Sequence, residues 1–398
     1  MMQSEMKPRM TQVKEIRSPE DILPALSNIV KRVPQRGFNE GLGLKAGERV
    51  YMVTDNSIDP ILTEALVEAI REARGVVDRV DLEGYHDLTD PIDIVDTIGG
   101  HNWFPDWVWE GAKQADVFLR MAFMKFPHVP NLPIPMRSRS PRILEWEIPP
   151  DILLSSCMTF PLDVWDAIDR KTWETYQGAR RVEITDNDGT NLTFDLTEKD
   201  WEPEADIFKP GHLFIPFPQD CKLHGVIAFR SLTFGGPIPL TKLHIEDRRV
   251  VEVEGGGTFG DRLRESFKQY QNATYEKLPG PGCNWVSTFA FCTNPKYRRS
   301  PIYPQVQSSA RVHAWCLGHR RSGIIHASVG SALETPKHKL IRHFELMSPT
   351  IVADDKVVIR EGHLTSLDDP EVRRIAQKHG DPDEILLEDW IPNPETAI

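Results

Sequence analysis

The sequence predicts an α/β N-terminal domain with a parallel, Rossmann-like sheet, followed by a β-rich α+β domain. Between residues 44 and 120, strand-like and helix-like patterns alternate, which is typical of a parallel sheet with right-handed crossovers. From residue 181, short alternating runs are separated by turns, which is typical of antiparallel strands. We place an N-terminal helical segment at 1–43, the α/β domain at 44–175, the β-rich domain at 176–365 and an acidic C-terminal tail at 366–398.

The composition is that of a folded chain without affinity for polyanions. Of its 398 residues, 40% are hydrophobic, so the chain is long enough for two or three domains with cores of their own. The formal net charge of −12 opposes a nucleic-acid-binding surface, because neutralising phosphates requires clustered Lys and Arg side chains. We therefore expect no nucleic-acid partner.

The cysteines and the N-terminus indicate a reducing compartment. The five cysteines are scattered and odd in number, and none stands in a Cys-x-x-Cys pair, which argues against a disulfide framework and against a thiolate zinc site. The N-terminus is polar and charged, and no run of about 18 apolar residues occurs in the sequence. We expect a cytoplasmic protein without a membrane partner.

The elements of the first half follow the alternating pattern. A helix is expected over residues 19–33 with Ser18 as its N-cap. Apolar residues at helical spacing predict another helix that ends at Gly75. Strands are expected at 49–54, 76–82 and 115–120. No Gly-x-Gly-x-x-Gly sequence follows the first of these strands, so a bound dinucleotide is not expected there.

The second half begins with a helix over residues 162–177 and continues as strands. Alternating runs at 181–185 and 190–195 flank the turn Asp186–Gly189, which predicts a β-hairpin. Further strands are expected at 212–216, 225–230, 243–245, 250–253 and 285–291.

Two β-like runs between residues 323 and 347 each contain a histidine among apolar neighbours. Residues two apart on a strand share a face, so His343 and Glu345 can reach one point together, and His326 on the preceding run adds a third donor. Two imidazoles and a carboxylate suit one divalent transition metal, namely manganese, zinc or iron. The alternative is a solvent-facing polar pair at His343 and Glu345, with His326 as a hydrogen-bonded core histidine.

A glycine-rich passage at residues 254–261 lies between an expected strand and an expected helix. Such a loop allows a ligand to approach the backbone closely, and it would deliver Glu254 or Asp261 to the metal as an additional carboxylate. The alternative is an ordinary turn in which Asp261 caps the helix.

The order of several short motifs resembles that of the thermophilic-type metallo-aminopeptidases, the relatives of aminopeptidases T and S. The motifs are Asp188-Gly189-Thr190-Asn191-Leu192, Pro210-Gly211, the glycines from Gly255, Thr293-Asn294-Pro295, His326-Ala327-Ser328-Val329-Gly330 and His343-x-Glu345. The resemblance covers roughly residues 180–362. It implies a metal-binding enzyme that forms homodimers or larger homo-oligomers.

Departures from the family pattern imply one metal and a different substrate. Thr288 stands at the place of a bridging glutamate, and two divalent ions need anionic bridges to offset their repulsion. The pattern resembles divergent offshoots that act on small aromatic rings, the 5-nitroanthranilate aminohydrolases and the 2,5-dihydroxypyridine dioxygenases. The dioxygenases have a histidine at the place of Thr288 and a serine at that of Ser328, so this chain keeps only the serine.

The resemblance and the residue types together predict a metal-dependent hydrolase. A metal-activated water would attack a carbon that bears an amino nitrogen on a small aromatic substrate. His313 and His319 are candidates for the acid that protonates the leaving group, and surface positions for both are the alternative. Candidate substrate contacts are Arg320, Arg321, Thr288 and Ser328. The alternatives are a ring-cleaving Fe(II) dioxygenase and an aminopeptidase.

Overall fold

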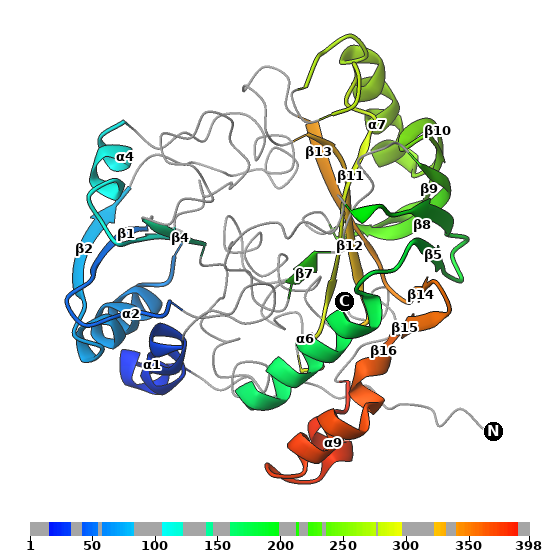
Figure 1. Ribbon diagram of the computed structural model, residues 1–398. Coiled ribbons are helices and arrows are strands. Elements are labelled where there is room, and N and C mark those ends of the chain that lie inside the picture. Colours follow the sequence, from blue (N-terminus) through cyan, green and yellow to red (C-terminus); the bar gives the residue numbers. More distant parts are fainter. Residues whose placement is uncertain are drawn as a thin grey trace.

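The structure is a computed structural model, which describes twelve stretches of the chain. These are residues 16–32, 42–54, 58–82, 106–121, 141–145, 160–198, 212–214, 222–232, 236–275, 278–296, 322–331 and 340–388. Two sheets dominate the described residues, one on each side of the molecule (Figure 1).

The smaller sheet is parallel throughout. Its four strands lie in the order β2–β1–β3–β4. Their bounds are Arg49–Thr54 for β1, Val76–Asp81 for β2, Val117–Arg120 for β3 and Arg142–Glu145 for β4. The first three are the strands that the sequence predicts, which confirms the parallel α/β arrangement of this part.

Helices cover both faces of the small sheet, in agreement with the burial of five consecutive residues of β1. Helices α1 (Leu23–Lys31) and α2 (Pro60–Glu72) share a core with Val50 and Met52 of β1. Helix α4 (Asp106–Ala112) packs on the opposite face, in a cluster with Tyr51 and Phe118. The helix expected over 19–33 is divided into a 3-10 turn, Pro19–Asp21, and the shorter α1.

The larger sheet is antiparallel and contains twelve strands. Its main path is β16–β15–β14–β5–β6–β8–β13–β12–β11–β7, and β9 and β10 extend it from β8. The strands are β5 Arg181–Thr185, β6 Asn191–Asp195, β7 His212–Phe214, β8 Leu223–Leu232, β9 Gly236–Glu246, β10 Arg249–Gly255, β11 Val286–Cys292, β12 Ile325–Ser331, β13 Leu340–Leu346, β14 Thr350–Ala353, β15 Lys356–Arg360 and β16 His363–Leu364. The expected hairpin is β5–β6.

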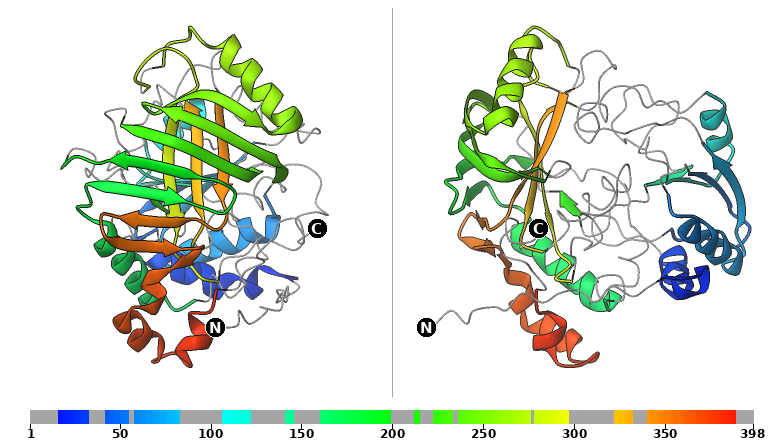
Figure 2. Two further views of the ribbon diagram at one scale, coloured as in Figure 1. Left: turned by 90° about the vertical axis from the view of Figure 1, so that its right-hand side faces the viewer. Right: turned by 180° about the vertical axis from the view of Figure 1, so that it is seen from behind.

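This sheet folds over into two layers. Strands β11, β12 and β13 run behind and across β5, β6, β8 and β9 (Figure 2). Two stacked aromatic pairs join the layers: Phe194 with Phe289, whose ring centroids are 5.8 Å apart, and Phe229 with Phe344 at 4.2 Å. All four rings are buried, so one face of β11–β13 is committed to the core between the layers.

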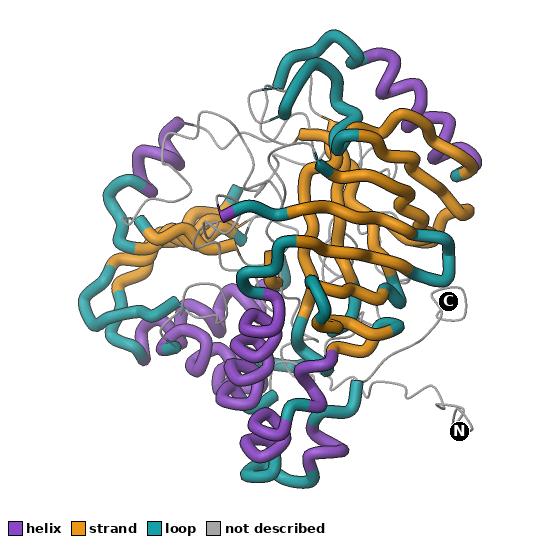
Figure 3. Tube along the Cα trace, turned by 45° about the vertical axis from the view of Figure 1, so that its right-hand side comes forward, coloured by secondary structure: helices purple, strands orange, loops and turns teal. Residues whose placement is uncertain are grey.

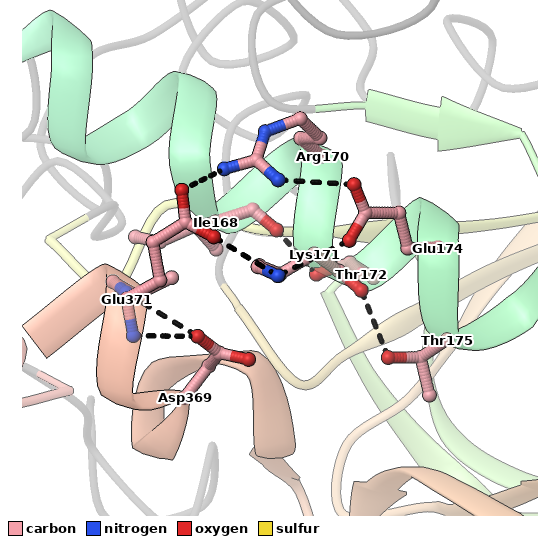
Figure 4. Close-up of polar contacts among 9 residues, drawn as sticks. Ile168, Arg170, Lys171, Thr172, Glu174, Thr175, Asp369 and Glu371 are labelled. Atoms are coloured by element: carbon pink, nitrogen blue, oxygen red, sulfur yellow. Dashed lines mark hydrogen bonds and ion pairs between the residues drawn. The ribbon is translucent and has the colours of Figure 1, made fainter.

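Several helices gather at one end of the large sheet, and another helix lies at its opposite end (Figure 3). Helix α6 (Leu162–Tyr176) contacts α9 (Pro370–Ala376), and Glu371 of α9 receives ion pairs from Arg170 at 2.7 Å and Lys171 at 3.0 Å (Figure 4). Val372 and Ala376 are fully buried in the main core. Within the segment 366–398, which the sequence analysis assigned to an acidic C-terminal tail, the described residues up to 388 therefore include α9 and the short α10 (Pro382–Ile385), which pack on the fold through Val372, Ala376 and Leu386.

Side chains from both sheets belong to one hydrophobic cluster. It includes Val50 and Leu119 of the small sheet together with Phe194, Phe289 and Ile325 of the large one. The mixed α/β class is thus confirmed, and the division at residues 43, 175 and 365 stays a prediction. Among the described helices, none has the length and apolar character needed to cross a membrane.

Candidate metal centre

Strands β12 and β13 place four polar side chains on one face of the sheet. In their antiparallel register, His326 lies opposite Glu345 and Ser328 lies opposite His343. Directly opposed residues and residues two apart on a strand share a face, so all four point the same way. The intervening Ile325, Ala327 and Phe344 face the core between the layers. The apolar alternation that predicts these strands also separates the polar face from the core.

The imidazole rings of His326 and His343 are in direct contact. Nε2 of His326 and Nδ1 of His343 are 3.0 Å apart, and the rings stack with their centroids 4.9 Å apart at an interplanar angle of 17°. His326 is buried, with 6% of its surface exposed, and Nε2 of His343 is buried as well. His343 is half-buried and Glu345 is buried, so this pair does not simply face solvent, whereas His326 is a buried, hydrogen-bonded histidine as the alternative in the sequence analysis holds.

Glu345 brings a carboxylate to the same buried face. Its side chain is 1% exposed, and the sheet register puts it directly opposite His326. Side chains at opposed positions of an antiparallel pair have Cβ atoms roughly 4.5–5.5 Å apart. The carboxylate is therefore within reach of the imidazole pair.

The two imidazoles are joined by a hydrogen bond, in which one ring nitrogen donates its proton to the other across 3.0 Å. A metal ion could bind both of these nitrogens only after that proton had left the space between them. Within the described stretches, however, no three histidine, cysteine, aspartate or glutamate side chains converge closely enough to hold a metal ion as they stand. The structure thus places two hydrogen-bonded imidazoles and one carboxylate on the same buried face, and their role as metal ligands stays a prediction.

A β-bulge in strand β11 adds hydroxyl groups to this face. Val286 pairs with Val329 and Thr288 pairs with Ser328, so one extra residue, Ser287, lies between them. The hydroxyls of Ser287 and Ser328 are 2.8 Å apart. Thr288 and Ser328, the two candidate substrate contacts of the sequence analysis, therefore stand on the same face as the histidines. Ser287 was missed there because simple alternation does not anticipate a bulge.

The two carboxylates of the glycine-rich passage lie elsewhere. Glu254 is exposed on β10 and pairs with Lys242 and His244, both at 3.2 Å, and strands β9 and β8 lie between β10 and β13. Asp261 is 73% exposed and pairs with Arg264 at 2.6 Å. We therefore leave both out of the proposed centre.

The glycines of that passage serve packing. Residues 255–257 all have positive φ, and a Cβ on Gly255 would lie 2.4 Å from the carbonyl oxygen of Leu240. Helix α7 (Gly257–Gln269) begins four residues before Asp261, so this aspartate does not cap the helix either. The loop is a tight turn against β9.

The remaining candidate residues cannot be placed. His313, His319, Arg320 and Arg321 lie outside the described residues, so their proximity to the histidine pair stays a prediction.

The C-terminal segment contacts the chain next to strand β12, which at that point is hydrogen-bonded to the residues that follow β11. Ser322, just before β12, donates a hydrogen bond from its hydroxyl to Glu388 at 2.6 Å, and its amide donates to the carbonyl of Asn294. The second carboxylate oxygen of Glu388 contacts His363 at 2.8 Å. That contact, together with Asp368 on the other ring nitrogen, raises the pKa of His363 to about 9.

Comparison with known proteins gives a relationship at the level of the fold. No profile of a known protein family and no curated protein matches the sequence. A solved structure of 2,5-dihydroxypyridine dioxygenase from Pseudomonas putida KT2440 superposes with a TM-score of 0.64 at 16% identity, over 88% of this chain and 98% of that one. The chain shares the fold of that enzyme. Wild-type AmpT from Thermus thermophilus aligns at 13% identity over 87% of this chain and 99% of that one, with a TM-score of 0.48.

Proposed function

We propose that this chain is a mononuclear metalloenzyme that hydrolyses a carbon–nitrogen bond of a small aromatic substrate. The observation that carries the proposal is the 3.0 Å approach of two imidazole nitrogens on a buried sheet face, with Glu345 directly opposite one of them. His326, His343 and Glu345 are the residues that would hold the ion.

In the proposed reaction, the carboxylate and the hydroxyl groups of this face have different roles. A divalent ion held by these residues would supply a water activated for nucleophilic attack. Glu345 balances the charge of the ion in a position shielded from solvent. Ser328 and Thr288 orient the substrate beside the histidines, since their hydroxyls both donate and accept hydrogen bonds.

A ring-opening oxygenation is the second candidate. The solved structure whose fold this chain shares is a dioxygenase, and two histidines with one carboxylate form the donor set of non-haem Fe(II) oxygenases. The aminopeptidase alternative stays a prediction, without an observation of this structure in its favour.

Turnover with and without oxygen separates the two candidates. Protein stripped with a chelator and reloaded with Mn²⁺, Zn²⁺ or Fe²⁺ is incubated with amino- and hydroxy-substituted aromatic compounds. Hydrolysis predicts ammonia release under anaerobic conditions, and oxygenation predicts oxygen uptake with iron alone. Activity that survives complete removal of metal would contradict both.

The matched variants are His343→Ala and His379→Ala. His379 is a surface histidine paired with Asp163 at 2.8 Å, far from β12 and β13 in the chain. We expect the first variant to lose at least about two orders of magnitude in turnover, because a metal-held nucleophile disappears, and the second to keep it.

A further inference from the structure

The bulge in β11 turns two consecutive hydroxyl residues toward the histidines. Val286 and Phe289 are both buried in the core although they are three positions apart, which regular alternation does not allow. The extra residue resolves this conflict, so that Ser287 and Thr288 both point away from the core. Bulges of this kind re-aim a side chain, and here the re-aimed hydroxyl is that of Ser287.

The Ser287 hydroxyl is held in place by its partner across the strand. It lies 2.8 Å from the hydroxyl of Ser328 and 3.3 Å from the Ser328 carbonyl oxygen. Ser328 is fully buried and stands opposite His343, whereas Ser287 is only partly buried. The pair thus presents an ordered, partly exposed hydroxyl on the face of the sheet that also carries His343.

The face that carries the hydroxyls also carries one carboxylate. Among the described side chains of β11, β12 and β13 that share it, none belongs to lysine or arginine, and Glu345 adds a carboxylate. Arg342 lies opposite Val329, on the other face. A serine hydroxyl donates one hydrogen bond and accepts others, so it can pair with a ring hydroxyl, which also does both.

We propose that Ser287, oriented by Ser328, is a specificity-determining residue that binds a hydroxyl substituent on the aromatic ring of the substrate. The inference rests on the proposed function and adds the substituent that the substrate carries. Thr288 and Ser328 complete a cluster of hydroxyls beside His343.

Binding of two small probes to the zinc-loaded protein tests this assignment. Aniline and 3-aminophenol differ by one ring hydroxyl, and the meta arrangement prevents chelation of the metal by both groups. Titration calorimetry should show tighter binding of 3-aminophenol by the wild type. In Ser287→Ala the affinity for 3-aminophenol should fall roughly fivefold to tenfold, and that for aniline less than about twofold, because one hydrogen bond is lost. Ser287→Thr, which keeps a hydroxyl, should recover most of the difference.

The zinc content of the same samples separates the two proposals. Wild-type protein that holds no zinc would contradict the proposed function itself. Zinc-loaded wild type that binds both probes equally, or Ser287→Ala that weakens both probes alike, would overturn the role of Ser287. Ser266→Ala is the control, because the Ser266 hydroxyl donates to the Arg262 carbonyl on the exposed side of α7 and should leave both affinities unchanged.

Discussion

His363 links the C-terminal segment to the large sheet through two carboxylates. Its ring nitrogens contact Glu388 at 2.8 Å and Asp368 at 2.9 Å, and the pKa is raised to about 9, first by the hydrogen bond to Glu388. An imidazole in an unfolded chain has a pKa of about 6.5. The protonated ring is therefore favoured in the folded state at neutral pH.

The raised pKa predicts a loss of stability at alkaline pH. The contribution of His363 is fully present below about pH 6.5 and disappears as the pH rises through about 9, because the folded state then loses the proton that it binds more tightly than the unfolded state. Urea unfolding at a series of pH values measures this. Relative to His363→Gln, wild type should lose stability between those limits, and parallel curves for the two proteins would refute the assignment.

The sequence predicts which side chains share a face of the sheet where those side chains lie on the same strand. His343 and Glu345 share a face because they are two apart, and the structure adds only their register with His326 and Ser328. Ser287 was not predictable, because its orientation depends on a bulge that shows only when Val286 and Phe289 are both seen in the core. The one available signal was this spacing of three between apolar residues.

The start of strand β12 depends on a glycine that no other residue can replace. Gly323 has a φ of +78°, and a Cβ at this position would lie 1.7 Å from the carbonyl oxygen of Gly362. Three residues later the strand carries His326. The backbone crossing at Gly323 therefore fixes where this histidine enters the site.

Gly323→Ala should destabilise the protein. Positive φ alone costs about 1–3 kcal/mol for an alanine, and the overlap with the Gly362 carbonyl adds to it. Chemical denaturation measures the change. Gly47→Ala is the control, since Gly47 also has positive φ but meets no atom within 4 Å, and an equal loss in both variants would contradict the role of the overlap.

Strand β13 is held to the other layer by Phe344. Its ring stacks on Phe229 with centroids 4.2 Å apart, and both rings are buried. Phe344→Ala should lower the free energy of unfolding by about 3–5 kcal/mol, because a cavity replaces the ring. Denaturant unfolding with Phe344→Leu as the smaller change should rank the variants, and a loss below about 1 kcal/mol for alanine would contradict the packing described.

The bounds of strands and helices follow from the sequence where a turn signal in the same segment determines them. The hairpin β5–β6 was expected within a residue of its bounds because Asp186–Gly189 is a strong turn signal. The helix expected after the glycine-rich passage at 254–261 begins inside that passage, because its glycines predict a loop and Gly257 is in fact the first residue of α7. Local propensity does not show that a glycine is required by contact with β9.

At the scale of the whole molecule, the parallel sheet and the antiparallel sheet share one hydrophobic cluster. The two fold types could be read from the change of pattern near residue 181, and the fold they form is that of the dioxygenase structure. Domain boundaries could not be derived in the same way, because side-chain contacts between distant segments decide them. The packing of Val372 and Ala376 into the main core shows this for the C-terminal segment.

The metal content of the purified chain tests the central claim most directly. After dialysis against zinc and then against metal-free buffer, elemental analysis should find about one ion per chain in the wild type and in His379→Ala. His326→Ala and His343→Ala, shown to be folded by circular dichroism, should each retain less than about a tenth of that amount, because each lacks one of the two nitrogens that stand 3.0 Å apart. Wild-type protein without bound metal, or variants that bind as much as the wild type, would contradict a metal centre at this pair.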